Sequence, residues 1–193
     1  MKRPVGRFVT ACALALGACG DDPVTILDLT VVETVPVDFG AMKGSVPEAA
    51  TVSLADLRDE PAYADHAADF ACGALDAEAS QLHVEALTVG PGATVLSYRV
   101  EVAPHGAGDF SLLARFNGSV VAGQKVPLSD PRVTLDPAGL ARVASIVLGA
   151  TPALDLQIVG EVPGDLERLQ VAVSLALDFS SDAKGCPSTT SGR

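Results

Sequence analysis

The segment that most constrains the fold of this chain reads RLQVAVSLALDF, from Arg168 to Phe179, and every second side chain in it is apolar and large. A period of two places alternate residues on opposite faces of a β-strand, so this segment predicts a sheet with one face on a core and one toward water. At about 3.3 Å per residue the strand approaches roughly 40 Å, so we expect it to bend or to switch between sheets. The expected core set is Leu169, Val171, Val173, Leu175, Leu177 and Phe179, and the expected solvent set is Gln170, Ala172, Ser174, Ala176 and Asp178.

The same alternation predicts further strands, and turn residues between them predict how the strands pair. In the strand expected at 26–39, Glu33 interrupts an apolar face of Leu27, Leu29, Val31, Val35 and Val37, which predicts a bulge or a break there. In the strand expected at 94–103, the inward residues are Leu96, Tyr98, Val100 and Val102. Three turn motifs predict antiparallel hairpins: Gly90-Pro91-Gly92 between 82–89 and 94–103, Asn117-Gly118 between 110–116 and 119–126, and Val162-Pro163-Gly164-Asp165 between 154–161 and 168–179.

One helix is strongly indicated after Asp136, a good N-cap that is followed by proline. Its apolar stripe is Leu140, Val143, Ala144, Val147 and Leu148, and Gly149 is expected to end it. A weaker helix is expected from Pro61 to about Cys72, with Tyr63, Ala67 and Phe70 buried. Because strands outnumber helices, the sequence predicts a mainly β fold: an antiparallel β-sandwich with one or two covering helices over residues 26–180, followed by a polar tail at 181–193.

The first residues have the pattern of an export signal. Lys2, Arg3 and Arg7 precede a short apolar run from Phe8 to Ala18, which is too short to span a bilayer as a helix. The run ends in Leu16-Gly17-Ala18-Cys19, which resembles the lipobox of bacterial lipoproteins. The resemblance covers only about the first twenty residues, and it implies a signal peptide at 1–18 and a flexible tether at 19–25.

In bacterial lipoproteins the cysteine of the lipobox carries diacylglycerol and becomes the acylated first residue after cleavage. The resemblance therefore implies that Cys19 is the lipidation site, and two or more acyl chains hold a protein stably on a membrane. The alternative is an ordinary secretory signal that is cut at an A-x-A-like site, with Cys19 incidental. In the sorting logic of this family, aspartate directly after the cysteine retains a protein at the inner membrane. Gly20 holds that position here, so we expect the outer membrane, with the periplasmic and surface sides both open.

Charge and composition exclude some classes of partner. Removal of the signal peptide takes away three of the 13 basic residues and leaves 24 acidic ones, so the net charge changes from −11 to −14. Such a chain repels the phosphates of nucleic acids and anionic lipid headgroups, so we expect no nucleic acid partner, and membrane contact only through the acyl anchor. The absence of Trp and the small number of other aromatic residues also argue against binding by stacking on bases or sugars. Cations or basic proteins stay open as partners.

Two cysteines remain in the body of the mature chain, because Cys12 lies in the signal peptide and Cys19 is the expected lipid site. In an oxidising compartment we expect a disulfide between Cys72 and Cys186, which would tie the C-terminal tail to the middle of the chain. Two free thiols are the competing interpretation. A metal site is not expected there, because neither cysteine has a second cysteine or a histidine at ligand spacing.

No catalytic motif stands out, and no catalytic residue, metal ligand or cofactor is predicted. His83 and Glu85 are expected on a solvated strand face, and His105 in a loop. The best candidate for a cation site is an acidic segment that lacks the spacing of a calcium loop, so a solvated charged face is the preferred interpretation. Its members are Asp56, Asp59, Glu60, Asp65, His66 and Asp69.

The sequence therefore favours a lipid-anchored, non-enzymatic protein of the cell envelope that acts as a binding or structural module and contacts another envelope protein through a surface patch or a strand edge. The alternative is a carrier of an apolar, lipid-like ligand, because a ligand pocket and a packed core give the same strand pattern. An enzyme with a dispersed site is a third, less favoured hypothesis.

Overall fold

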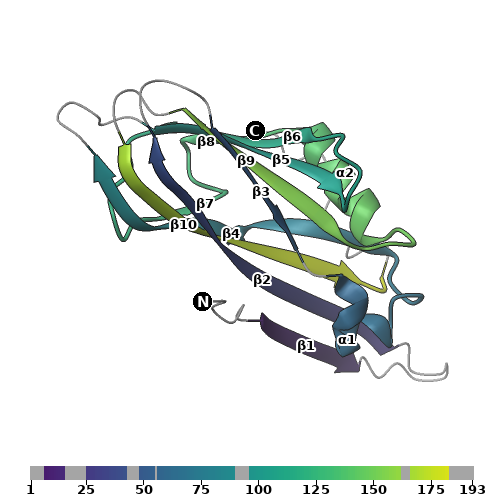
Figure 1. Ribbon diagram of the computed structural model, residues 1–193. Coiled ribbons are helices and arrows are strands. Elements are labelled where there is room, and N and C mark those ends of the chain that lie inside the picture. The colour runs from purple at the N-terminus through teal and green to yellow at the C-terminus, as the bar shows by residue number, and fades with distance from the viewer. Residues whose placement is uncertain are drawn as a thin grey trace, which may run out of the picture.

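The computed structural model describes residues 7–15, 25–42, 48–54, 56–89, 96–161 and 166–182. Within these residues the strands form two five-stranded antiparallel sheets (Figure 1). The first sheet contains, in spatial order, β1 (Arg7–Ala15), β2 (Thr25–Met42), β10 (Leu166–Ser180), β4 (Cys72–Val89) and β7 (Lys125–Pro127). The second sheet contains β3 (Glu48–Ser53), β9 (Leu154–Glu161), β5 (Leu96–Pro104), β6 (Ser111–Gly118) and β8 (Val133–Leu135).

The two sheets pack face to face around one apolar core, which confirms the predicted mainly β sandwich (Figure 1). Both sheets contribute to the core, because alternate residues of each strand point inward. Its largest fully buried side chains include Phe116, Leu113, Leu156 and Ile158 from the second sheet and Phe179, Leu29 and Leu175 from the first.

Strand β10 confirms the alternation that the sequence shows, although its outer face is less exposed than expected. All six residues of the expected core set are buried. On the other face Ala172 and Ala176 are also buried, because β10 lies between β2 and β4. The Ser80 hydroxyl, on β4, accepts a hydrogen bond from the Ala176 N–H at 2.9 Å. The strand stays in one sheet, and its pairing with β4 contains register shifts, one of them between Ser174 and Ala176.

The three predicted hairpins are wrong, and of the strand expected at 119–126 only Lys125 and Val126 lie in a strand, β7. The 154–161 strand, β9, pairs with β3 and β5, whereas β10 belongs to the other sheet. In the same way β4 pairs with β10 and β7 rather than with β5, and β7 pairs with β4 rather than with β6. Turn residues indicate a reversal of direction, but at each of these places the reversal takes the chain across to the opposite sheet.

The Asn117-Gly118 pair shows why a turn motif led to the wrong prediction of a hairpin. A two-residue hairpin turn needs positive φ, but Gly118 has none and lies within β6, opposite Leu96. A Cβ at Gly118 would lie 3.0 Å from the Arg132 side chain and 3.2 Å from the Phe116 ring, so glycine permits a close approach there. The turn comes later, at Gly123 with φ of 81°.

The predicted bulge or break at Glu33 is also wrong. Strand β2 runs without a register shift through this position, where Glu33 lies opposite Leu175 of β10 and Arg7 of β1. The backbone ladder with β10 keeps β2 continuous despite the interrupted apolar pattern, and it does not depend on residues 7–15, which lie in the predicted signal peptide. Leu29 and Val31 are buried, as expected for the apolar face of β2.

The strongly indicated helix is α2 (Pro137–Val147), and the Asp136 carboxylate accepts hydrogen bonds from the N–H groups of Ala138 and Gly139. Its buried face differs from the expected stripe, because Leu148 is the C-cap and is 41% exposed. The buried residues are Gly139, Val143, Ile146 and Val147. The weaker helix is α1 (Pro61–Ala64), preceded by the 3-10 turn η1 (Leu57–Asp59). It ends at Ala64, well before the predicted end near Cys72; Tyr63 is buried and Phe70 half-buried, but Ala67 is exposed, so the prediction that Ala67 is buried is wrong.

Candidate functional site

A polar hollow of about 210 Å³ lies on the second sheet, over β5, β6 and β9. Arg99, Arg115 and Asn117 are exposed there, whereas the alternate residues Tyr98 and Phe116 are buried, so the hollow is on the outer face. It is lined by Ser97, Tyr98, Arg99, Arg115, Phe116, Asn117, Val159 and Gly160.

Four polar side chains form two facing pairs on this surface. Arg99 of β5 lies directly opposite Arg115 of β6, and Ser97 lies directly opposite Asn117. Side chains of directly opposed residues start about 4.5–5.5 Å apart, and like charges in this position destabilise a sheet. The fold thus brings two positive charges together at a place where stability of the sheet alone would not favour them.

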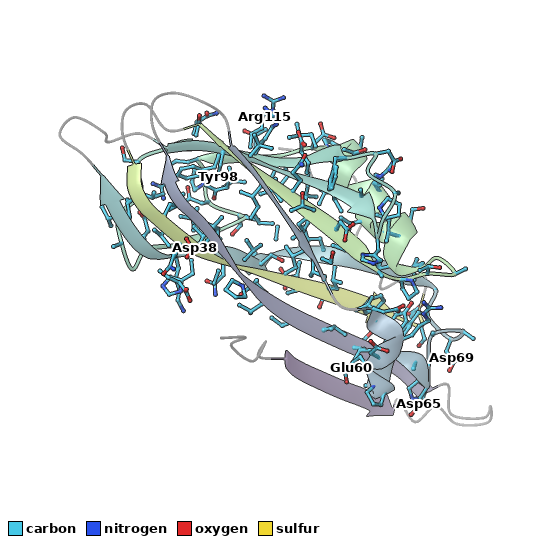
Figure 2. The ribbon with its side chains drawn as sticks, in the orientation of Figure 1. Asp38, Glu60, Asp65, Asp69, Tyr98 and Arg115 are labelled. Carbon is cyan, nitrogen blue, oxygen red and sulfur yellow. The ribbon has the colours of Figure 1, made fainter. Side chains whose placement is uncertain are left out.

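The two arginines differ in their contacts. The Arg99 Nε donates a hydrogen bond to Glu101 Oε1 at 2.7 Å, which orients the guanidinium along β5. Arg115 has no ion-pair or hydrogen-bond partner among the described side chains. In Figure 2 it projects away from the sheet, while Tyr98 lies beneath, between the two sheets. The hollow therefore presents one oriented and one unneutralised cation to solvent.

Three other arginines of the described chain, Arg58, Arg132 and Arg142, each contact a carboxylate. Hydrogen bonds from the Arg58 side chain lower the pKa of Asp56 to about 2, and those from Arg132 lower the pKa of Asp130 to about 2. Arg142 contacts Asp109, and its hydrogen bond to that carboxylate lowers the pKa of Asp109. Among the arginines whose side chains the structure describes, Arg115 is the one without a carboxylate contact.

Beneath the hollow, the interior contains a small apolar cavity of about 20 Å³. Tyr98 is only 9% exposed, and its hydroxyl is buried without a hydrogen-bond partner in the described part of the chain. Burial raises the pKa of Tyr98. A volume of this size holds about one water molecule, so this cavity is too small for a lipid-like ligand. The cavity is lined by Leu82, Val84, Tyr98, Val120, Ile158, Gly160, Leu169 and Val171.

A second polar cluster surrounds Asp155 at the start of β9, far along the sheet from Gly160. His105 Nδ1 lies 2.8 Å from Asp155 Oδ1, and the Gly106 N–H donates to Asp155 Oδ2 at 2.9 Å. Burial acts to raise the pKa of Asp155, but the hydrogen bonds from Gly106, Ser53 and His105 outweigh it, so that this pKa is lowered. Ser53 contacts the carboxylate rather than the imidazole, so the cluster lacks the order of a Ser-His-Asp triad and fixes the loop after β5.

The predicted cysteine sites lie largely outside the described residues. Cys19 and Cys186 are both outside them, so lipidation and the disulfide stay predictions. Cys72 is half-buried at the start of β4, and its backbone lies opposite Ser180, the last residue of β10. Ser180 precedes Cys186 by six residues, and a segment of that length is long enough for Cys186 to reach Cys72.

The acidic segment around α1 does not gather into a metal-binding arrangement: among the described residues no group of three or more His, Cys, Asp or Glu side chains is placed to hold an ion. Asp56 caps η1, and His66 Nδ1 lies 3.3 Å from Asp69 Oδ2. Glu60, Asp65 and Asp69 surround α1 in Figure 2. His83 and Glu85 flank buried Val84 and so lie on the outer face of β4, as predicted.

Sequence reasoning did not nominate Arg99 and Arg115. The alternation around Tyr98 does predict that Arg99 faces outward, and Arg115 precedes the Phe116 that was expected to end a strand. What the sequence lacked was the pairing of β5 with β6 and their register, since the predicted partner of 94–103 was 82–89.

No protein-family model matches the chain, and no curated protein matches its sequence. Among the described residues, no helix has both the length and the apolar character needed to cross a bilayer.

Proposed function

We propose that this protein is a lipid-anchored, non-enzymatic binding module of the cell envelope, acylated at Cys19, with the outer membrane as its preferred location. The hollow on the second sheet is its recognition surface. The Cys72–Cys186 disulfide closes the C-terminal tail onto the start of β4.

The observation that carries this proposal is the position of the hollow relative to the start of the domain. Strand β2 begins at Thr25, six residues after Cys19, at the end of the sandwich where α1 lies (Figure 1). The hollow lies toward the opposite end, near the start of β5 and the end of β6. An anchor at Cys19 would therefore leave the recognition surface turned away from the bilayer.

The charges around α1 support the same orientation. Asp59, Asp65 and Asp69 are exposed at the end of the domain that the tether would enter. Anionic headgroups repel such a surface, so the domain would stand off from the membrane and depend on the acyl chains for attachment.

The non-enzymatic assignment rests on the cluster around Asp155. Its hydrogen bonds hold the Gly106 loop, and in the described part of the chain no nucleophile bonds to the imidazole of His105. The carrier of an apolar ligand is the less favoured function, because a cavity of about 20 Å³ is far below the several hundred Å³ of typical ligand pockets.

Metabolic labelling with a palmitate analogue in a bacterial host tests the anchor. The full chain should be labelled and should remain with the membrane fraction, whereas Cys19→Ser should lose the label. Cys72→Ser is the matched control and should keep it. An unacylated N-terminus upstream of residue 19, or far downstream of it, would overturn the proposal.

Crosslinking in intact cells tests the recognition surface. The wild-type protein should capture a defined envelope component, and Arg115→Glu should lose it while Arg58→Glu, at the α1 end, retains it. Equal capture by both variants would show that the hollow is not the recognition surface.

A further inference from the structure

We propose that the hollow on the second sheet binds the phosphate monoester group of a small soluble ligand, with Arg99 and Arg115 as its two cationic contacts. This inference rests on the proposed role of the hollow as a recognition surface and names the chemistry of its ligand, but it does not depend on whether Cys19 is acylated.

The charge of the hollow matches a dianion. Two guanidinium groups start from directly opposed positions in adjacent strands, and among the described side chains only Arg99 of the two contacts a carboxylate, through its Nε. A phosphate monoester carries about −1.5 to −2 charges near neutral pH, whereas a carboxylate carries one. Binding of the dianion relieves the repulsion between the two arginines to a greater extent than a monoanion would.

The hydrogen-bonding groups also fit phosphate. Glu101 holds the Nε of Arg99 and leaves its terminal nitrogens available, and Arg115 has its whole donor fork available. Guanidinium forks bind phosphate oxygens through paired N–H donors. The second facing pair, Ser97 and Asn117, adds a hydroxyl and an amide beside the arginines. Together these groups can donate to several oxygens of one tetrahedral anion.

The size and the surroundings of the hollow favour a small ligand. A volume of about 210 Å³ is less than that of a typical drug-sized pocket, so it accommodates a phosphate group and a few further atoms. Val159 lies opposite Arg99 on the β9 side and provides an apolar wall. The rest of the described surface offers exposed acidic groups around α1, so a phosphate is directed toward the hollow rather than toward that end.

Equilibrium dialysis of the purified protein against radiolabelled inorganic phosphate tests the proposal. Saturable binding at one site is expected, and Arg115→Gln and Arg99→Gln should each weaken it by about tenfold or more, in line with the loss of a charged contact. Arg115→Lys should give a smaller loss, because the charge remains while the donor fork is removed. Lys125→Gln is the matched control: it removes one exposed positive charge from the other sheet and should leave the affinity unchanged.

Two further measurements test whether the site prefers phosphate to a carboxylate, and whether the phosphate belongs to a soluble ligand or to a lipid headgroup. Acetate should compete poorly, and vesicles that contain phosphatidic acid should not retain a Cys19→Ser chain. Absence of saturable phosphate binding, equal weakening by Lys125→Gln, equal competition by acetate, or retention on the vesicles would each overturn the proposal. Asn117→Asp keeps both arginines and should weaken phosphate binding, because it places a negative charge in the hollow. This variant tests the site without the removal of either arginine.

Discussion

The two ends of the sandwich are packed in different ways. At the α1 end, the rings of Tyr63, Phe70 and Phe179 contact one another with centroids 5.0–5.8 Å apart, and the Tyr63 hydroxyl donates to the Val147 carbonyl at 2.6 Å. At the hollow end, Tyr98 stacks on Phe116 with ring centroids 4.7 Å apart, but its hydroxyl has no hydrogen-bond partner among the described residues, and a small cavity adjoins it.

The same contrast appears at two glycines. A Cβ at Gly73 would lie 2.9 Å from the Phe179 ring, whereas a Cβ at Gly160 would meet nothing within 4 Å. The α1 end is therefore closely packed, and its buried Tyr63 hydroxyl is hydrogen-bonded. The hollow end contains unused volume, the Tyr98 hydroxyl without a partner among the described residues, and the opposed cations Arg99 and Arg115. Departures from good packing and charge pairing are expected where a surface is shaped by function rather than by stability.

The largest expected effect is at the filled end. Phe179→Ala should lower the free energy of unfolding by about 3–5 kcal/mol, because the ring is buried and its neighbours cannot close the cavity. Ile158→Val, a smaller truncation beside the existing cavity, should cost about 0.5–1.5 kcal/mol. Urea unfolding followed by circular dichroism measures both, and similar costs for the two variants would contradict the contrast between the ends.

The next effect concerns the Asp155 cluster and depends on pH. The pKa of Asp155 is lowered in the folded state, so its contribution to stability is present above the unfolded-state pKa of about 4 and is lost as pH falls through the folded value. Asp155→Asn should cost about 1–3 kcal/mol at neutral pH, because hydrogen bonds to a charged group are lost.

Thermal unfolding as a function of pH measures this contribution. The difference in stability between wild type and Asp155→Asn should shrink as the pH is lowered below about 4. A difference that stays constant across that range would show that the charge of Asp155 does not stabilise the loop.

A smaller effect of the opposite sign is expected at Tyr98. Tyr98→Phe removes a buried hydroxyl that has no partner among the described residues and should raise the free energy of unfolding by about 1 kcal/mol. Tyr63→Phe is the matched control and should destabilise, since it removes the bond to the Val147 carbonyl. Guanidinium unfolding compares the two, and a loss of stability in Tyr98→Phe would indicate that a bound water satisfies the hydroxyl.

The smallest effect is expected at Gly160. Gly160→Ala should stabilise by about 0.4–1 kcal/mol, because the new Cβ has room and the unfolded chain loses freedom. Gly73→Ala, the same change at the filled end, should destabilise because its Cβ meets the Phe179 ring. Differential scanning calorimetry of both variants tests the sign, and a lower melting temperature for Gly160→Ala would argue against free space at the hollow end.

The strands were predictable because burial of one face of a sheet requires an apolar residue at every second position, and this pattern can be seen within a short segment of sequence. Leu169 to Phe179 alternates with small or polar residues, and each member of that apolar set is buried. Asp136 followed by Pro137 identified the start of α2 for a similar reason, since capping is a property of neighbouring residues.

Pairing between strands was not predictable, because it depends on residues far apart in the chain. Gly118 was interpreted as a turn residue, but it lies within a strand, where it permits the close approach of the Arg132 side chain. The hollow was missed for the same reason. Arg99 and Arg115 are separated by 16 positions, and nothing near either residue specifies that they lie opposite one another. The Asp155–His105 contact joins residues 50 positions apart and left no local signal either.

The position of β10 has a consequence for the timing of folding. This 15-residue strand is the last along the described chain, yet it lies between β2 and β4 in the first sheet. The ladders of β10 with β2 and β4 cannot form until residues 166–180 have been synthesised, and distant pairings of this kind slow folding.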